Sequence, residues 1–125
     1  MADVYINRIS SFFPNEVVQN DEMEEYLGYI GGEKSKSKRI VLRSNGIEQR
    51  YYALDKNGRV THTNAELTAQ AVKKLFDDPA ELRKMDMLAC GTTSPDVLLP
   101  SHAVMVHGLL PESSNIEVIS NAGAC

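Results

Sequence analysis

Alternating apolar and polar positions predict three short strands in this chain of 125 residues. The first is expected over residues 4–9, before Pro14 interrupts regular strand pairing. The second is expected over residues 85–90 and the third over residues 116–120, where β-branched side chains favour extended backbone. The third strand is expected to be short and buried.

Helix signals in the first half of the chain are local. Asn20 is a candidate N-cap for an acidic helix over residues 21–27, which Gly28 would end. Residues 40–43 are expected to form one or two helical turns that stop at residues 45–46. Residues 47–52 are expected to be extended, and residues 55–58 to form a turn.

The clearest helix is predicted from Thr63 to Phe76. Glu66 lies three residues after Thr63, which is the spacing of a capping box. Helical periodicity predicts a packing face made of Leu67, Ala71, Leu75, Val72 and Phe76. Pro79 can begin another turn after this helix.

A second helix is expected from Ser101, as its cap, to Leu110, and its expected packing residues are Ala103, Val104, Val106 and Leu110. The resulting order of strands and helices is an α/β pattern, with a mixed, mostly parallel sheet and helices packed on it. Ligands of such sheets bind beyond the carboxyl ends of the strands. Residues 92–96 and 121–125 are loops that fit this rule.

Composition narrows the class of protein. The net charge of −4 gives no general attraction to nucleic acid or anionic membranes, and no apolar run approaches the length of a membrane span. The N-terminus lacks the features of a signal peptide. Two cysteines without a disulfide framework indicate a reduced, cytoplasmic protein.

One window departs from the overall charge. Residues 33–50 hold six cationic and two acidic side chains, and the cations are Lys34, Lys36, Lys38, Arg39, Arg43 and Arg50. Such a run is either a solvated loop or a patch for a phosphate-bearing ligand or an acidic partner.

Cys125 follows the third predicted strand on the small-residue turn formed by residues 121–125. It is either a small buried thiol or a nucleophile placed on a tight turn. A helix after the turn would lower the thiol pKa, but the chain ends at this residue. Cys90 lies inside a predicted core strand, so we interpret it as a packing residue.

Several motifs occur together in one order: Phe13-Pro14, residues 43–50 (RSNGIEQR), residues 91–96 (GTTSPD), Leu99-Pro100-Ser101 and Gly123-Ala124-Cys125. This ordered set resembles the N-terminal half of a β-ketoacyl-acyl carrier protein synthase III, in the thiolase-like superfamily. The resemblance covers nearly the whole chain. It implies a C-terminal half that is absent from these residues.

The resemblance implies roles residue by residue. Cys125 matches the nucleophilic cysteine. Arg43 matches an arginine on the coenzyme A side, although Ser44-Asn45 stands where one threonine is usual. Arg39 lies near the position of an adenine-stacking tryptophan that this chain lacks. Leu99 matches a residue of the partner subunit's acyl pocket, and being smaller than phenylalanine it suits a longer or branched acyl group.

The implied chemistry is Cys-mediated acyl transfer from acyl-CoA, followed by decarboxylative condensation with malonyl-acyl carrier protein in fatty-acid or related biosynthesis. The family's catalytic His and Asn lie in the other half, and His62, His102 and His107 do not match them. The chain alone is therefore expected to be inactive. The expected partners are acyl-CoA as a substrate, acyl carrier protein and a second subunit across residues 116–120. No metal or covalently bound cofactor is expected.

Two other functions fit the sequence. One is acyl transfer to a non-malonyl acceptor, such as an amine or hydroxyl, because the adenine-stacking residue is missing. The other is a non-catalytic module that mediates dimerisation or binds a carrier protein through the basic window.

Overall fold

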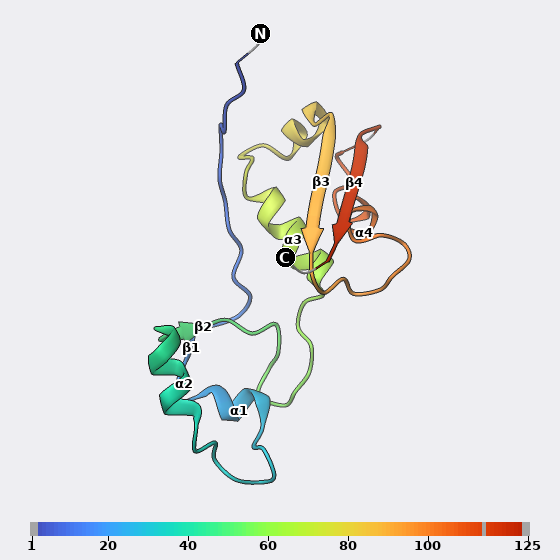
Figure 1. Ribbon diagram of the computed structural model, residues 1–125. Helices are drawn as coiled ribbons and strands as arrows, with labels where there is room; N and C mark the ends of the chain where they lie inside the picture. The colour runs from blue at the N-terminus through green and yellow to red at the C-terminus, as the bar shows by residue number, and fades with distance from the viewer. Residues whose placement is uncertain (1–2, 114, 124–125) are drawn as a thin grey trace. The chain divides into compact units, whose positions relative to one another are not determined.

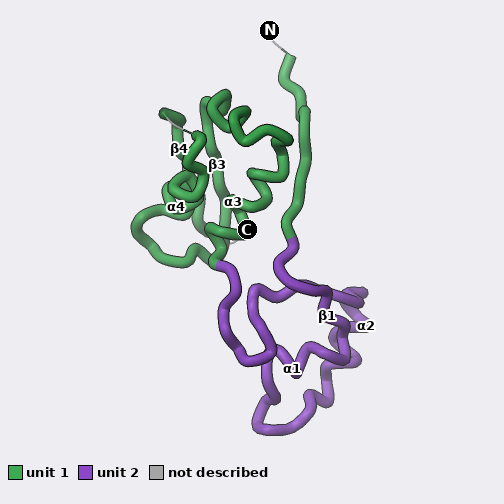
Figure 2. Tube along the Cα trace, turned by 180° about the vertical axis from the view of Figure 1, so that it is seen from behind, with its two compact units in different colours: residues 1–12, 63–125 green, residues 13–62 purple. Residues whose placement is uncertain are grey.

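The computed structural model describes residues 3–113 and 115–123, and it divides into two compact units (Figure 2). Unit 1 comprises Met1–Phe12 and Thr63–Cys125, and unit 2 comprises Phe13–His62. Each unit contains its own two-stranded sheet.

The sheet of unit 1 pairs β3 (Met87–Thr92) with β4 (Glu117–Ala122) in parallel, as the sequence predicts (Figure 1). The register runs from Met87 opposite Glu117 to Thr92 opposite Ala122. Helix α4 (His102–Gly108) lies between the strands in sequence and packs against both of them. This strand–helix–strand unit confirms the predicted α/β class, although both strands extend two residues beyond the predicted ends at 90 and 120.

The core of unit 1 is built where α3 (Asn64–Lys73), α4, the sheet and the 3-10 helix η1 (Pro79–Lys84) meet. Its buried residues are Ala65, Ala69, Leu82, Leu88, Cys90, Ala103, Val106 and Leu110. Alanines on both facing helices let the helix backbones approach closely, and the larger side chains fill the space beside them. The predicted turn of helix at Pro79 is confirmed as η1.

The capping box that opens α3 is confirmed. The Thr63 hydroxyl accepts from the Glu66 backbone N–H at 3.2 Å, and the Thr63 backbone N–H donates to the Glu66 carboxylate at 2.7 Å. The helix ends at Lys73, three residues before the predicted end, because the next turns tighten to bonds such as that from the Leu75 N–H to the Val72 carbonyl.

The predicted packing faces of both helices need correction. On α3 the fully buried residues are Ala65 and Ala69, and the predicted residues are half-buried: Val72 and Phe76 pack against the core as expected, whereas Leu67, Ala71 and Leu75 are not among its packing residues. On α4, Val104 is exposed rather than packed. Helix α4 also ends at Gly108 instead of Leu110. Because α3 and α4 pack closely, the side of α3 that carries the small alanines faces the core. The apolar periodicity of the sequence does not show which side of the helix this is.

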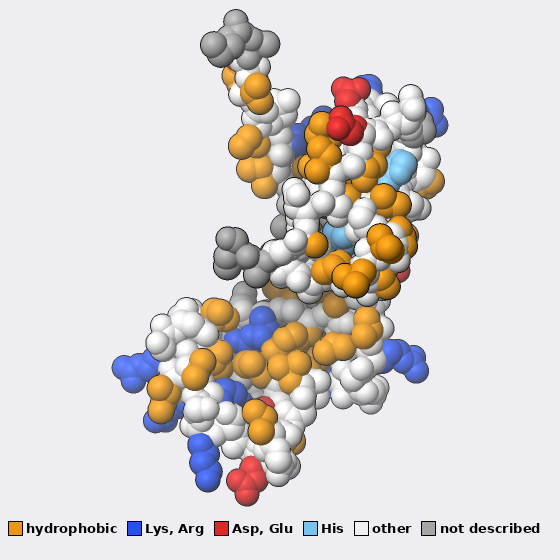
Figure 3. Space-filling model, turned by 45° about the vertical axis from the view of Figure 1, so that its right-hand side comes forward, with side chains coloured by type: hydrophobic (Ala, Val, Ile, Leu, Met, Phe, Trp, Pro, Cys, Tyr) orange, Lys and Arg blue, Asp and Glu red, His pale blue; other side chains and the backbone are white. Residues whose placement is uncertain are grey.

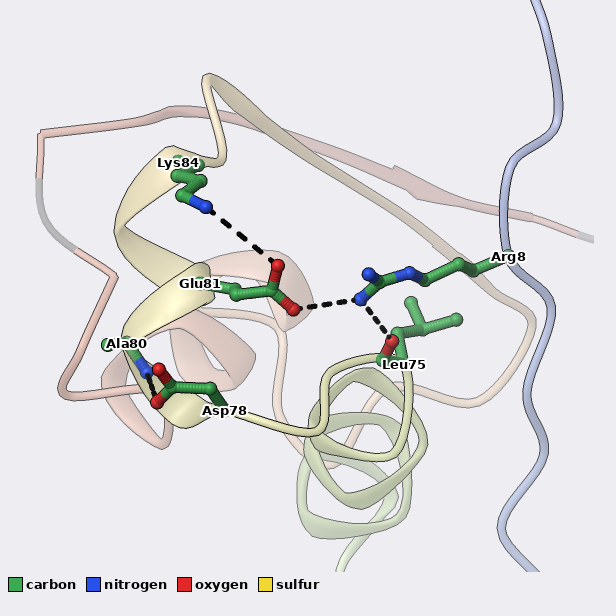
Figure 4. A network of polar contacts seen from close by, with 6 residues as sticks. All are labelled: Arg8, Leu75, Asp78, Ala80, Glu81 and Lys84. Atoms are coloured by element: carbon green, nitrogen blue, oxygen red, sulfur yellow. Dashed lines mark hydrogen bonds and ion pairs between the residues drawn. The ribbon is translucent and has the colours of Figure 1, made fainter.

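The predicted strand over residues 4–9 is wrong. These residues are extended, but no strand pairs with them among the described residues, and Val4, Ile6 and Ile9 are 96%, 84% and 86% exposed. Arg8 anchors the segment instead: its guanidinium donates to the Leu75 carbonyl at 2.9 Å and to Glu81 at 3.0 Å (Figure 4). An alternating pattern forms a strand only where a neighbouring backbone supplies hydrogen bonds.

In unit 2, β1 (Val18–Gln19) pairs antiparallel with β2 (Gln49–Arg50), and two helices, α1 (Met23–Leu27) and α2 (Lys38–Asn45), complete it. The predicted helical turns at residues 40–43 are thus confirmed within a longer helix. The stops at Gly28 and Gly46 are confirmed, with φ of 78° and 68°. The turn at residues 55–58 is also confirmed, since Gly58 donates to the Asp55 carbonyl at 3.0 Å.

Asn20 does not cap α1. Its side-chain nitrogen donates to the Ile47 carbonyl at 2.9 Å, and its side-chain oxygen accepts from Arg50. Asn20 therefore links the end of β1 to β2 and the residues just before it. Helix α1 begins later than predicted, at Met23, with Glu22 as the capping residue and no side-chain cap.

Replacing the cap of α3 tests how much the capping box contributes. Thr63→Ala removes the acceptor for the Glu66 N–H, and we expect the free energy of unfolding to fall by about 1 kcal/mol. Urea unfolding followed by circular dichroism measures this change. Thr93→Ala, at an exposed loop threonine, is the matched control and should change stability by no more than a few tenths of a kcal/mol. Equal effects of the two changes would contradict the assigned cap.

Candidate functional site

Two chain segments leave the sheet of unit 1 at the same edge. Because β3 and β4 are parallel, the segments after Thr92 and after Ala122 start side by side, and the Gly123 N–H donates to the Thr92 carbonyl at 3.2 Å. This edge is where ligands of parallel sheets bind. Asn121 and Ala122, which the sequence predicts as part of the small-residue turn, are part of β4 instead. Cys125 lies outside the described residues.

The loop after β3 is held rigidly against α3. Asp96 accepts from the first backbone N–H groups of that helix, from Asn64 at 2.8 Å and from Ala65 at 2.9 Å. The Asn64 side chain in turn donates to the Thr92 hydroxyl at 2.9 Å and to the Ser94 carbonyl at 2.6 Å. A carboxylate at a helix N-terminus satisfies donors that have no partner within the helix and favours the positive end of its dipole. Residues 92–96 are therefore a fixed wall beside the strand ends.

The N-terminus of α4 is tied to β4 near the same edge. The Ala103 N–H donates to the Ser120 hydroxyl at 3.3 Å. Since Ser120 is the third residue from the end of β4, this bond fixes where the chain leaves the sheet. The bond positions the segment that precedes Cys125, although it has no chemical role of its own.

His102 is a core residue rather than a member of the strand-end site. Its side chain is 3% exposed, and its Nε2 lies 3.2 Å from the Thr68 hydroxyl. That hydroxyl already donates to the Asn64 carbonyl at 3.0 Å, so it accepts from His102, and the proton lies on Nε2. Nδ1 is buried and has no partner among the described residues.

The other two histidines make local contacts. His107 Nε2 lies 3.3 Å from the Ser113 carbonyl, at the C-terminal end of α4. His62 Nδ1 lies 3.0 Å from the neighbouring Thr61 hydroxyl, in unit 2. Neither contact resembles a nucleophile–base pair.

Cys90 lies in β3 as expected, 8% exposed within the core of unit 1. Burial raises the pKa of its thiol, because the apolar surroundings disfavour the thiolate. Cys90 is therefore protonated and shielded at neutral pH, which fits a packing residue.

Unit 2 contains a cleft of about 550 Å³ along α2. It is lined by Asn20, Asp21, Lys38, Arg39, Leu42, Arg43, Gly46, Ile47 and Glu48, so no aromatic ring lines it. Arg39 and Arg43 lie one helical turn apart and are exposed, and within the described chain neither makes a hydrogen bond or an ion pair. They are available to an anionic ligand.

The other cations of the basic window differ in availability. Lys38 bonds Glu24 at 2.9 Å, and this bond, together with the Ser35 N–H, holds the pKa of the Glu24 carboxyl below its usual value. Arg50 donates to Asn20. The basic window is thus partly structural, and Arg39 and Arg43 are its cleft-lining cations without a partner among the described residues, in a cleft that Asp21 and Glu48 also line.

Leu99 lies in unit 1, in the loop between β3 and α4, and its side chain is 86% exposed. The structure therefore places Leu99 and β4, the strand before Cys125 in the sequence, in unit 1. Arg39 and Arg43 belong to unit 2. The anchoring of residues 92–96 by Asn64 was missed from the sequence. Two features of the sequence could have indicated this anchoring: Asp96 in the loop, and Asn64 at the first position of a helix with a capping box.

Comparison with known proteins tests the family resemblance that the sequence motifs indicate. No family profile matches the chain. β-Ketoacyl-acyl carrier protein synthase III of Bordetella petrii is 31% identical over 100 residues, which are 80% of this chain and 29% of that protein. The synthase III of Ehrlichia canis is 27% identical over 103 residues, 82% of this chain and 28% of that protein. The resemblance to β-ketoacyl-acyl carrier protein synthase III is confirmed. The chain spans less than a third of the length of these synthase III relatives.

Solved structures confirm the thiolase-like fold of the synthase III enzymes. A tetronic acid condensing enzyme matches 94% of this chain and 34% of its own, with a TM-score of 0.74 and 25% identity. The synthase III of Thermus thermophilus matches 94% of this chain and 33% of its own, with a TM-score of 0.66 and 21% identity. Both matches extend over residues of both units.

The buried state of Cys90 predicts selective labelling. Iodoacetamide should modify Cys90 at least about tenfold more slowly in the folded protein than in urea at pH 8, because the folded state withholds the thiolate. Peptide mapping by mass spectrometry measures the rate at each cysteine.

The same shift has a defined pH dependence. Burial raises the pKa of Cys90 in the folded state, so folding favours the protonated thiol. The free energy of unfolding therefore keeps its full value below the ordinary thiol pKa and falls as the pH rises through the folded-state pKa. Equal labelling rates in the folded and unfolded states would show that Cys90 is accessible.

Proposed function

We propose that this chain carries the nucleophile of a synthase III-type acyltransferase, with Cys125 as the acyl-accepting residue. The observation that supports this most directly is the 31% identity to a synthase III across 80% of the chain. In addition, β4, the strand that precedes Cys125 in the sequence, ends at the edge where the 92–96 loop starts.

In the proposed reaction, the Cys125 thiolate attacks the carbonyl carbon of an acyl-CoA thioester. A carbon–sulfur bond to Cys125 forms, the bond to coenzyme A breaks, and the coenzyme A thiolate takes up a proton. A malonyl group on acyl carrier protein then loses carbon dioxide, and its enolate carbon attacks the acyl-enzyme. A carbon–carbon bond forms, and Cys125 leaves as thiolate.

The second step needs donors for the enolate oxyanion. The resemblance assigns these to a His and an Asn that His62, His102 and His107 do not match. We therefore expect the 125 residues alone to catalyse no condensation. Condensation is proposed only for a protein that contains this chain together with that His and that Asn.

Arg43 and Arg39 are proposed to bind the phosphates and adenosine of coenzyme A. Their support is the cleft of about 550 Å³ in which both cations lack an internal partner. A guanidinium can stack on a purine, so Arg39 is the candidate replacement for the missing tryptophan. Leu99 is proposed to reach the acyl pocket of a second subunit, which fits its exposure.

A dimer and a cytoplasmic location remain parts of this proposal. Within the described residues, β4 has a strand neighbour on one side only, so its other edge is open to a second subunit. The described part of the chain contains no helix that is long and apolar enough to cross a membrane.

Acyl transfer to a non-malonyl acceptor is the second candidate. The fold of this chain is shared with a tetronic acid condensing enzyme, at a TM-score of 0.74. The absence of an aromatic ring from the cleft lining also departs from ordinary coenzyme A recognition. A panel of malonyl-carrier, amine and hydroxyl acceptors offered to the acylated protein separates the two reactions.

Acylation of Cys125 is the direct test. The protein containing this chain, incubated with acetyl-CoA or octanoyl-CoA, should gain the mass of one acyl group on the peptide that contains Cys125. Cys125→Ala should abolish this gain, whereas the matched control Cys90→Ala should keep it. An unacylated Cys125 in the wild-type protein would favour the non-catalytic module and overturn the proposal.

Arg43→Ala should weaken acyl-CoA recognition. Losing one charge-assisted contact to a phosphate is expected to raise the KM for acyl-CoA about tenfold or more, with a smaller change in kcat. Acylation rates across acyl-CoA concentrations measure this. Arg83→Ala, at an exposed arginine of η1, is the control and should leave KM unchanged. An unchanged KM for Arg43→Ala would remove this residue from the site.

A further inference from the structure

Thr92 is the last residue of β3, at the edge of the sheet where the chain also leaves β4. Its side chain is half-buried. Its hydroxyl oxygen accepts from the Asn64 side-chain nitrogen at 2.9 Å and from the Ser94 backbone N–H at 3.2 Å. A threonine hydroxyl can accept two hydrogen bonds and donate one. Both acceptor positions of the Thr92 hydroxyl are therefore in use.

A third group fixes the direction of the bond between Asn64 and Thr92. The same Asn64 side-chain atom lies 2.6 Å from the Ser94 carbonyl, and a carbonyl oxygen only accepts. That atom is therefore the amide nitrogen, and its two hydrogens go to the Ser94 carbonyl and to the Thr92 hydroxyl. Since a backbone N–H only donates as well, the Thr92 proton can go to neither neighbour. Within the described residues, the Thr92 O–H has no acceptor.

Contacts on both sides hold Asn64 in this orientation. Its backbone N–H donates to Asp96 at 2.8 Å, and its carbonyl accepts from the Thr68 hydroxyl at 3.0 Å. Thr68 accepts in turn from the buried His102 of α4. The Thr92 donor is thus held by a chain of bonds that reaches into the core of unit 1. A donor held in this way needs little rearrangement to stabilise a developing negative charge.

The place of Thr92 indicates which group can use its proton. Ala122, at the end of the strand that precedes Cys125 in the sequence, lies opposite Thr92 in the register. In the proposed reaction, the carbonyl oxygen of a thioester gains negative charge when a thiolate attacks its carbon. A neutral O–H donor stabilises that oxygen. The neighbouring Thr93 is exposed and makes no side-chain hydrogen bond to the described residues, so its hydroxyl is not oriented.

We propose that the Thr92 hydroxyl donates a hydrogen bond to the carbonyl oxygen of the acyl group that is transferred to Cys125, and that Asn64 is the positioning residue that directs this donor. This proposal rests on the proposed function. It adds a donor for the acyl-transfer step, whereas the His and Asn of the resemblance serve the condensation step. Asn64 acts only through Thr92.

Two nearly isosteric changes, made in the protein that contains this chain, remove the donor in different ways. Thr92→Val removes the hydroxyl. Asn64→Asp places a carboxylate that accepts the Thr92 proton and turns it toward α3, while an acidic residue still suits the N-terminus of that helix. Each change should lower the maximal rate of Cys125 acylation by acetyl-CoA about tenfold, and the double variant should lower it no further. Thr92→Ser keeps the hydroxyl and should stay within about twofold of the wild-type rate.

The KM for acetyl-CoA should change by less than about twofold in these variants, because the interactions assigned to coenzyme A are left intact. Those cations lie in unit 2, where Figure 3 shows cationic and hydrophobic side chains interspersed. Unit 2 also contains the matched control, a second asparagine–threonine pair in which the Asn15 side chain donates to the Thr61 hydroxyl at 2.8 Å. Thr61→Val and Asn15→Asp should alter neither the acylation rate nor KM.

Infrared spectroscopy separates the hydrogen bond from a loss of packing. The probe is acetyl-CoA that is isotope-labelled at its carbonyl carbon, so that the thioester band of the acylated protein can be identified. A donated hydrogen bond weakens the carbonyl bond. The band should therefore lie at a lower wavenumber in the acylated wild-type protein and in Thr92→Ser than in Thr92→Val.

An acylated wild-type protein, with an unchanged rate and an unshifted band in Thr92→Val, would overturn the Thr92 donor and leave the proposed function intact. An equal loss of rate in Thr92→Ser and Thr92→Val would show that the residue acts through packing, which also overturns the donor. If Cys125 of the wild-type protein gains no acyl group from acetyl-CoA or octanoyl-CoA, both proposals are wrong.

Discussion

The parallel pairing of β3 with β4 is the constraint on which the candidate site in unit 1 depends. With Thr92 opposite Ala122, the chain leaves both strands at one edge, and the Gly123 N–H bonds the Thr92 carbonyl. An antiparallel pair would send the two segments to opposite edges. The crossover through α4 requires a helix that packs on both strands, and the fully buried Ala103 and Val106 provide that packing.

The N-terminus of α3 holds the loop after β3 in place. Its first N–H groups are satisfied from two directions: the Thr63 hydroxyl accepts within the helix, and the Asp96 carboxylate accepts from outside it. A helix end that needs acceptors and a loop that offers them hold each other in place. The loop at the strand ends is thereby fixed by the same helix whose alanines pack in the core.

Features that depend on neighbours in sequence could be predicted from the sequence. The capping box at Thr63, the stops at Gly28 and Gly46 and the turn at Asp55 each require only a few adjacent residues. Features that depend on distant partners could not. The alanine side of α3 is selected by α4, and residues 4–9 lack a strand neighbour within the described residues. Asn20 bonds residues of β2's region instead of capping α1.

The same distinction applies to the candidate site. The sequence identifies the basic window, but Lys38 and Arg50 could not be separated from Arg39 and Arg43, because their partners Glu24 and Asn20 lie far away in sequence. Cys125 lies outside the described residues, so its role rests on the strand that precedes it and on the synthase III resemblance.

Unit 2 is held together largely by polar and aromatic contacts. Neither α1 nor α2 has a buried residue, and beside the buried Val18 of β1 the unit is joined by the Glu24–Lys38 pair, the Asn20 bonds and the stacking of Phe13 on Tyr51 at 4.7 Å. Charges committed to these contacts cannot serve a ligand without loosening the unit. Arg39 and Arg43 make no such contact within the described residues, so an incoming anion need not break one. Binding at these two arginines therefore costs the fold nothing, whereas binding at Lys38 would compete with the contact that positions α2.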